Sequence, residues 1–400
     1  MSKEPQQAAP LLKNPNLHII FFITLMAVMG VASITPAFPD VIRYFKISPA
    51  EVGLLITSFT LPGVLLTPLA GILADRLGRK NILVPSLFLF GIAGLACMFT
   101  RSFHVLLALR FIQGIGAASL GSLNITIIGD LFAGQQRAAA MGYNASVLSI
   151  GTASYPAIGG ILAMYGWQYP FILPVLAVPV AFWVLTRLKN PEPDKQPDLK
   201  TYLKRTWKNI NKRDVWGLFV MNILIFVILY GAYLSYFPLL LEKRLHANAL
   251  QIGLMMSGFS VVTALTSSQL KSINRWFKPR TQLIFSFIFY LITMIFMSFA
   301  SSWLILLIPV ITFGLGHGMA IPGIQNLLVG FAPMKERAAF MSINSMVLRL
   351  GQTLGPLFIG VFYTLGGITT AFFAGAGVAF FMILLALFVI RLKTEKEPTP

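Results

Sequence analysis

The sequence predicts an all-α integral membrane protein whose twelve transmembrane helices form two parallel six-helix repeats. The first observation is composition: the 400-residue chain is 56% hydrophobic and only 11% charged. Its mean hydropathy of +0.77 leaves too little polar surface for a soluble fold. The second observation is a series of long apolar runs. The third is an internal repeat that relates the two halves of the chain.

The apolar runs are each long enough to cross a bilayer as a helix. Only helices and closed barrels satisfy backbone hydrogen bonds in lipid, and these runs are too long and too uniformly apolar for barrel strands. We therefore predict twelve helices, at residues 17–39, 51–74, 81–100, 104–129, 138–164, 167–187, 215–241, 249–271, 281–300, 303–331, 338–364 and 367–390.

Identical residues recur at an offset of 200 positions. Asn144 and Pro156 reappear as Asn344 and Pro356. An even number of helices returns the chain to its starting side, so the two copies have the same orientation. Glycines keep the same offset: Gly53, Gly114, Gly116, Gly151 and Gly160 recur as Gly253, Gly314, Gly316, Gly351 and Gly360.

The repeat and the helix pattern predict two bundles, residues 17–188 and 214–391. A long segment rich in Pro, Lys and Arg, 189–213, is expected to link them on the cytoplasmic side. Short cytoplasmic tails, 1–16 and 392–400, complete the chain. A substrate site is expected near the middle of the membrane between the bundles.

The net charge of +18 does not indicate nucleic-acid binding, because that function needs basic residues gathered on one soluble face. The basic residues instead alternate between the two sides of the predicted helices. This asymmetry predicts a multi-pass protein of the cell membrane with both termini cytoplasmic. The predicted outer connections contain only five basic residues: Arg43, Lys46, Arg101, Lys243 and Arg244.

The most informative stretch is the charged turn Gly71-Ile-Leu-Ala-Asp75-Arg76-Leu-Gly78-Arg79-Lys80, between the second and third predicted helices. Gly71 would allow close helix packing, and Gly78 permits a backbone conformation that other residues avoid. A basic turn can also serve only to fix topology. The full pattern, however, resembles the loop motif G-x-L-x-D-R-x-G-R-K of the major facilitator superfamily, at the place where that family has it.

The resemblance implies a gating role for this turn. Asp75 would dock near a helix start in the other half, before Ala338, where the helix dipole favours a carboxylate. Arg79 would pair with a carboxylate at the inner end of the fourth helix, and Asp130 is the matching candidate. A contact made in one state and broken in the other supports alternating access.

Arg110 lies inside the fourth predicted helix, in a segment similar to the family's R-x-x-Q-G-x-G-A-A motif. An arginine at membrane depth costs about 2.5 to 3.5 kcal/mol on insertion scales, so it needs a partner. Its depth makes Asp40 and Glu51 the nearest carboxylates. The alternative is that Arg110 snorkels or caps a buried carbonyl.

The fifth predicted helix carries Gly151-Thr-Ala-Ser-Tyr155-Pro156-Ala-Ile-Gly159-Gly160, which is similar to the family's antiporter motif G-x-x-x-G-P-x-x-G-G, with Tyr155 in place of the central glycine. Its physical content is close packing and a proline-weakened helix, which serves either as a hinge or as packing alone. In the family this motif is associated with exporters, so the resemblance favours efflux. The end of the first helix, from Gly30 to Asp40, also resembles the corresponding segment of the twelve-helix drug:proton antiporters; the alternative is that its prolines, Pro36 and Pro39, only end the helix.

No acidic residue lies in the middle of a predicted helix, because all thirteen fall at or beyond helix ends. Proton coupling would therefore depend on Asp40 or Glu51 near Arg110, or on His317 in the tenth helix. The alternative for His317 is a purely structural role, in which it is held by a hydrogen bond.

Arg349 is the second intramembrane cation, and its repeat partner is the neutral Ser149. It would meet an anionic substrate or be satisfied by amides such as Gln352 and Asn344. Other polar groups at membrane depth are candidates either for substrate binding or for contacts between helices: Asn124, Asn144, Asn222, Tyr230, Tyr233 and Gln325.

These observations predict a secondary transporter, expected to be a monomer, that exports small lipophilic compounds by rocker-switch alternating access coupled to protons. The alternatives are a carrier of a small organic anion that uses Arg349 and Arg110, and a non-transporting membrane sensor. No nucleotide loop, metal-ligand cluster or nucleophile arrangement predicts an enzyme, a metal or a cofactor.

Overall fold

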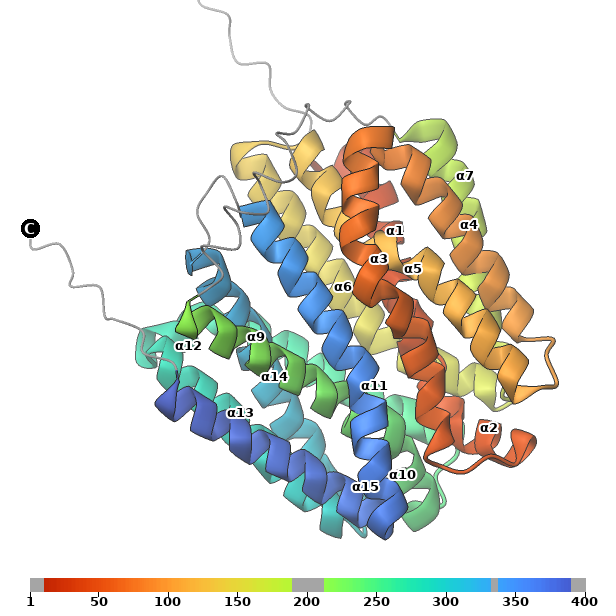
Figure 1. Ribbon diagram of the computed structural model, residues 1–400, viewed down its shortest axis with the longest axis vertical. Coiled ribbons are helices and arrows are strands. Elements are labelled where there is room, and N and C mark those ends of the chain that lie inside the picture. The colour runs from red at the N-terminus through yellow and green to blue at the C-terminus, as the bar shows by residue number, and fades with distance from the viewer. Residues whose placement is uncertain (1–10, 189–211, 332–336, 390–400) are drawn as a thin grey trace, which may run out of the picture.

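The structure is a computed structural model that describes residues 11–188, 212–331 and 337–389. Every regular element in these ranges is helical (Figure 1). The predicted linker and both tails lie largely outside the described residues. The amino-terminal half contains α1 (Pro15–Ala32), α2 (Phe38–Phe45), α3 (Leu54–Leu77), α4 (Arg79–Cys97), α5 (Phe103–Leu131), α6 (Gly134–Ala163) and α7 (Ala177–Arg187), with short 3-10 segments between some of them.

The carboxyl-terminal half repeats this pattern. Its last element, α15, bends at Gly366 and Gly367, where the backbone leaves the helical region, so it comprises two crossing helices. This bend brings the described part of the chain to twelve membrane-spanning helices, which confirms the predicted fold. The elements are α9 (Arg213–Phe226), η5 (Val227–Tyr236), α10 (Phe237–Leu245), α11 (Ala249–Ser268), α12 (Leu270–Trp276), α13 (Pro279–Phe299), α14 (Trp303–Phe331) and α15 (Arg337–Phe388).

The first crossing helix is longer than predicted. Pro36 and Pro39 were expected near its end, but the chain passes through a 3-10 turn, Thr35–Ala37, and continues as α2 to Phe45. Each proline falls at the start of its element, where the missing N–H would have had no partner. The whole span therefore runs over Pro15–Phe45.

The internal repeat is also visible in the packing. A Cβ on Gly114 would lie 2.1 Å from the carbonyl oxygen of Phe59, and one on Gly314 would lie 3.1 Å from that of Phe259. Both pairs keep the offset of 200 positions. In each half the fourth helix therefore lies against the second with a glycine at the contact, so the same interface is built twice.

The halves meet along two seams, α3 against α15 and α6 against α11. A Cβ on Gly53 would lie 2.9 Å from Pro356 Cβ, and one on Gly253 would lie 2.2 Å from the Pro156 carbonyl oxygen. These contacts are again related by the repeat. They lie toward the end of the molecule that holds Phe45, Ala163 and Leu245, which we call the closed end.

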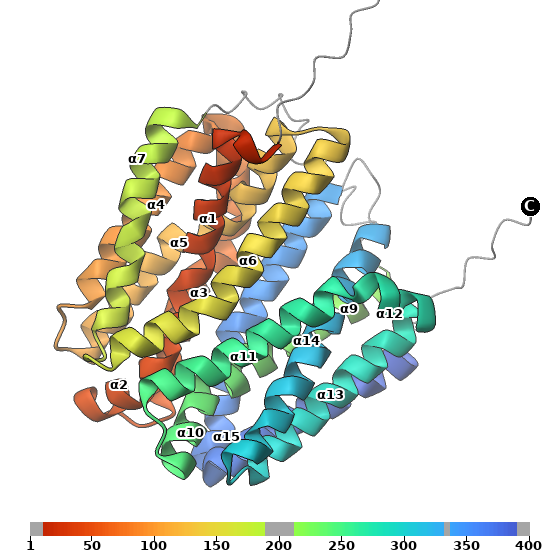
Figure 2. The ribbon, with the colours of Figure 1, turned by 180° about the vertical axis from the view of Figure 1, so that it is seen from behind.

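At the opposite end, which we call the open end and which holds Leu77, Gly134 and Ser268, the halves separate. Residues 134–139 of α6 are all exposed. Six consecutive positions cover every face of a helix, so no described helix of the other half covers this part of α6. Within the described chain, the Arg137 side chain bonds only to the Phe132 and Gly129 carbonyl oxygens of its own half. Figure 2 shows α6 and α11 meeting near α2 and diverging from there.

Candidate functional site

The charged turn lies at the open end between α3 and α4. Gly78 separates these helices with φ at +93°, a conformation that favours glycine. Arg79 follows as the first residue of α4 and is only 5% exposed, and its Nε lies 3.1 Å from Asp130 Oδ2 at the end of α5. The structure therefore brings together the two residues that the motif paired.

The rest of the turn is less constrained. Gly71 was expected to permit close packing, but a Cβ there would meet no atom of the described residues within 4 Å, so the described part of the chain makes no close contact at this position. Arg76 is exposed and Lys80 is half-buried. The side chain of Asp75 and those of the segment around Ala338 lie outside the described residues, and the expected docking between them stays a prediction.

The glycine–proline motif of α6 forms part of two interfaces. A Cβ on Gly159 would lie 1.8 Å from the Ser33 carbonyl oxygen, and one on Gly160 would lie 2.4 Å from that of Ala249 in the other half. Gly151 faces Leu25 and Val28 of α1 in the same way. Larger residues at these positions would push the helices apart, so the motif supplies close packing.

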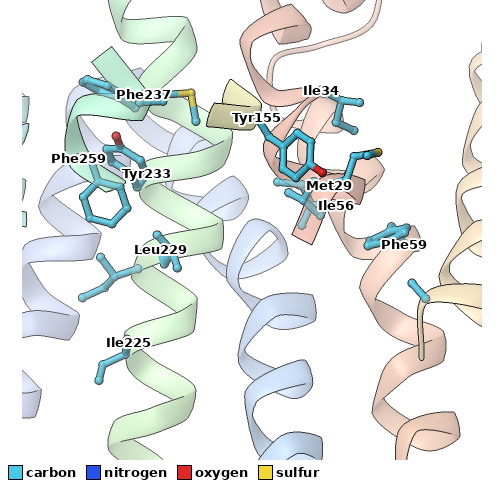
Figure 3. Packing of buried hydrophobic residues seen from close by; sticks show 14 of the residues in the cluster. Met29, Ile34, Ile56, Phe59, Tyr155, Ile225, Leu229, Tyr233, Phe237 and Phe259 are labelled. Carbon is cyan, nitrogen blue, oxygen red and sulfur yellow. The ribbon is translucent and has the colours of Figure 1, made fainter. Parts of the chain in front are cut away.

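Tyr155 and Pro156 occupy the middle of the motif. Pro156 lies inside a helix that is continuous over Gly134–Ala163. Its carbonyl oxygen packs closely against Gly253 of the other half. Tyr155 is 7% exposed. Figure 3 shows it among Met29, Ile34 and other apolar side chains of the amino-terminal half.

Arg110 is fully enclosed in the amino-terminal half. Its Nε donates to the Leu55 carbonyl oxygen at 3.2 Å, and its Nη1 donates to Gln113 Oε1 at 2.7 Å. Its Cζ lies 4.2 Å from the centre of the Phe59 ring, a cation–π contact. Among the described residues, Nη2 has no partner.

Neither carboxylate expected beside Arg110 is bonded to it, so the structure corrects that expectation. Asp40 accepts a hydrogen bond from Arg43, and Glu51 accepts one from the Ser48 backbone at 2.7 Å. Helix depth placed these acids near Arg110, but both side chains turn toward the surface, and the carbonyl-capping alternative describes the site.

Arg43 links the two halves at the closed end. Its Nη1 donates to Glu242 Oε1 of α10 at 2.7 Å, and its Nη2 bonds Asp40 Oδ1. Beside this group lies a cavity of 610 Å³, lined by residues of both halves that include Tyr44, Trp167 and the carboxylates of Asp40 and Glu242. The charges at these positions can be read from the sequence, but their pairing across the two halves cannot.

The buried asparagines bond within each half. In the amino-terminal half, Thr24 Oγ1 donates to Asn144 Oδ1 at 2.5 Å and accepts from Asn124. In the carboxyl-terminal half, Asn222 Nδ2 donates to Asn344 Oδ1 at 2.7 Å. Since Asn144 and Asn344 are repeat partners, both halves tie their first helix to their fifth, and the role as contacts between helices is what the geometry displays.

His317 lies against an aromatic cluster of the carboxyl-terminal half. Its Nδ1 is 2.6 Å from the Tyr290 hydroxyl oxygen. Tyr233 is completely buried, with ring centroids 4.8 Å from Phe259 and 4.9 Å from Phe237. Figure 3 shows these three rings together. The Tyr233 hydroxyl has no partner among the described residues, and its burial makes direct contact with a substrate implausible in this state.

Arg349 is half-buried on α15 at the seam with α3. Its Nη1 donates to Gln352 Oε1 at 3.2 Å, and its stem passes Gly63, where a Cβ would lie 3.1 Å from Arg349 Cδ. Tyr230 is half-buried, and its ring centroid lies 5.9 Å from that of Phe226. Gln325 is half-buried and makes no side-chain hydrogen bond to the described residues.

The first helix of the carboxyl-terminal half contains a wide turn that no sequence pattern predicts. Val227–Tyr236 forms a π-helix, a wide helical form that is rare and often found at functional sites. Gly231 lies within it, and a Cβ there would be 2.4 Å from the Gly355 carbonyl oxygen. Within the described ranges, no group of His, Cys, Asp or Glu side chains could hold a metal ion.

Comparison with known proteins agrees with this architecture. Residues 20–250 and 231–400 both match the model of the Major Facilitator Superfamily. The chain is 23% identical to the quinolone resistance protein NorA of Staphylococcus aureus over 357 residues, covering 88% of this chain and 90% of the relative. It is 25% identical to multidrug resistance protein 1 of Bacillus subtilis over 360 residues, with the same coverage.

Solved structures resemble the fold at lower identity. A bacterial homolog of the human lysosomal transporter Spinster, in an inward-facing and unoccupied conformation, has a TM-score of 0.75 at 18% identity, covering 94% of each chain. The nucleoside transporter NupG has a TM-score of 0.75 at 13% identity, covering 93% of this chain and 96% of its own. With a family model that matches nearly its whole length, this chain belongs to the Major Facilitator Superfamily of membrane transporters.

Proposed function

We propose that this protein exports small lipophilic compounds across the cell membrane by alternating access, using inward proton flow as its energy source. The observation that carries the proposal is the asymmetry between the two ends: the halves are joined at the closed end and separated at the open end. The names of the two relatives, which concern drug resistance and match along most of the chain, support export of lipophilic compounds.

The charge distribution supports an orientation with the open end and both termini in the cytoplasm. Cytoplasmic connections of membrane proteins carry an excess of Lys and Arg. Basic residues of the described chain are denser at the open end, at Arg76, Arg79, Lys80, Arg137, Lys271, Arg275, Lys278 and Arg280, than at the closed end, at Arg43, Lys46, Arg101, Lys243 and Arg244.

Two sets of contacts would be exchanged during transport. Opening of the closed end breaks the Arg43–Glu242 ion pair and separates Gly253 from Pro156. Closing of the open end brings the turn with Arg79 and Asp130 against the other half. Each state then has contacts that the other lacks, which is what a two-state transporter needs.

Proton coupling would use a group that titrates in only one state. Asp40, Glu51 and His317 are the candidates, and Asp40 is attractive because its partner Arg43 is also bonded across the closed end. Opening would change the surroundings of this carboxylate. A membrane potential of 100 mV contributes about 2.3 kcal/mol for each charge moved.

The test is efflux of a panel of lipophilic dyes of different charge, such as fluorescein, Nile red and ethidium, from proteoliposomes or cells that contain the purified or expressed full chain. We expect efflux to be faster than in empty controls and to stop when a protonophore collapses the proton gradient. Asp130→Asn is the matched variant and should slow efflux. Efflux that is insensitive to the protonophore would refute coupling, and an unchanged dye distribution across a panel of lipophilic compounds would refute export.

A further inference from the structure

The charge of the membrane-embedded part is unusual for a binding site that would receive a cation. The acidic residues of the described spans lie near span ends, at Asp40, Glu51, Asp130, Asp214 and Glu242. The middle of the described spans therefore contains no carboxylate. No opposite charge would stabilise a cationic compound there. The free-energy cost of removing the cation from water would therefore not be offset by an ion pair.

Two arginines do lie in the middle of spans, and they differ in accessibility. Arg110 is 0% exposed and held within one half, so a substrate between the halves cannot reach it. Arg349 is half-buried at the seam. Its only described side-chain hydrogen bond is to the neutral amide of Gln352, and its other guanidinium nitrogens are not among the enclosed polar atoms.

The seam keeps this guanidinium where it is. A side chain on Gly63 would collide with the Arg349 stem, because a Cβ there would lie 3.2 Å from Nε. The Arg349 backbone carbonyl oxygen lies 2.8 Å from Thr353 Oγ1. The guanidinium keeps N–H donors that make no hydrogen bond to the described residues. Because the group is planar, two of these donors can bind the two oxygens of a carboxylate or a sulfonate.

An aromatic wall begins beside Arg349. A Cβ on Gly351, two residues after Arg349, would lie 2.9 Å from Phe226 Cβ, and the Tyr230 ring centroid lies 5.9 Å from that of Phe226. Phe226 continues to His317 at 6.5 Å, and His317 to Phe259 at 5.6 Å. Tyr230, Phe226 and His317 are only half-buried, as Arg349 is, so part of each residue is accessible.

We propose that the substrates of this transporter are aromatic organic anions, with the anionic group held by Arg349 and the aromatic body against Tyr230, Phe226 and His317. The proposal rests on the proposed function in that it names the substrate class of the same site. Arg349 fixes the sign of the charge, because an uncompensated cation in a partly dry site attracts anions and repels cations.

Three probes of similar shape and different charge test this assignment: 2-naphthoate, 2-naphthamide and 2-naphthylmethylammonium. Binding to the purified full chain is measured by quenching of intrinsic fluorescence. We expect 2-naphthoate to bind about tenfold or more tightly than the amide, and the ammonium compound to bind more weakly than both.

Arg349→Gln should remove the preference for 2-naphthoate and leave the affinity for 2-naphthamide within about twofold, because a neutral ligand does not depend on the guanidinium charge. Arg349→Lys should retain part of the preference, which shows that the loss is not a folding defect. Arg101→Gln changes the net charge equally at an exposed position and is the control. Thermal unfolding of each variant is measured in parallel.

A preference for the ammonium compound, an anion preference that survives Arg349→Gln, or no charge preference at all, including no binding of any probe, would overturn the assignment. Export is measured separately in proteoliposomes. Anion binding without transport would refute the proposed function and leave the anion site standing. Export of ethidium with no effect of Arg349→Gln on anion binding would refute only the anion site.

Discussion

Breaking the ion pair between Arg43 and Glu242 should shift the protein toward a state that is open at the closed end. The pair joins the two halves at 2.7 Å, and the side chains are 60% and 37% exposed. Solvent screens an ion pair of this exposure, so we expect a contribution of about 0.5 to 1 kcal/mol. Arg43→Gln should therefore raise the population of the open form about two- to fivefold.

Cysteine labelling measures this population. Ile252 is 1% exposed and lines the cavity at the closed end. In an Ile252→Cys chain that also carries Cys97→Ala, a membrane-impermeant maleimide reacts only while the seam is open. The labelling rate on intact cells should rise two- to fivefold with Arg43→Gln, since the rate follows the open population when closing is fast.

The charge-matched control is Lys46→Gln, which removes one positive charge, as Arg43→Gln does, from an exposed position of the same segment. It should leave labelling unchanged. Combining Arg43→Gln with Glu242→Gln should add little to either single change, because both remove the same interaction. Equal labelling rates in the Arg43→Gln and Lys46→Gln chains would show that the pair does not hold the halves together, and the reasoning would fail.

Three further changes separate contacts that matter from those that do not. Asp130→Asn removes the ion pair that Asp130 makes with the buried Arg79 and should lower stability by about 1 to 3 kcal/mol, seen in thermal unfolding. Gly253→Val should abolish transport but not folding, since its side chain would meet the Pro156 carbonyl oxygen across the seam; normal transport would contradict this. Gly71→Ala should be neutral or stabilise by up to about 1 kcal/mol, because no atom of the described residues lies within 4 Å of its new Cβ, and a loss of stability would show a missed contact.

The sequence predicted the fold because the physics that fixes it is local and repetitive. Run length determines which segments cross the membrane. The recurrence of Asn144 and Pro156 at Asn344 and Pro356 then implies that one packing scheme is used twice, which the glycine contacts of both halves show. The pairing of Arg79 with Asp130 was expected for a different reason, since the resemblance to the family's loop motif implied it, and Asp130 lies at the matching helix end.

The partner of Arg110 was not accessible in this way. Counting residues from a helix end gives depth, and depth placed Asp40 and Glu51 nearby. It does not give the direction in which each side chain points around its helix axis. That direction is set by tertiary packing, which turns Arg110 toward the Leu55 carbonyl oxygen and the Phe59 ring.

The π-helix of Val227–Tyr236 was hidden for another reason. Its residues are ordinary helix and membrane residues, and nothing in their order indicates a wider turn. The close approach of Gly231 to the Gly355 carbonyl oxygen needs both helices in place before it has any effect. A long-range contact of this kind leaves no local pattern in the sequence.

The two seams share one scheme of glycine and proline, but among the residues that the structure describes only the α3–α15 seam carries a cation in the middle of a span, Arg349. On α15, Thr353 Oγ1 lies 2.9 Å from Thr60 Oγ1 of α3, and Thr57 Oγ1 donates to the Thr353 carbonyl oxygen at 3.1 Å. The same Thr353 hydroxyl lies 2.8 Å from the carbonyl oxygen of Arg349, one helical turn away. The proposed binding residue and the hydrogen bonds that close this seam therefore share a single turn of α15. A substrate held by Arg349 adds its contacts to the helix that must move when the seam opens, and such a differential contact is what lets a ligand change the balance between two states.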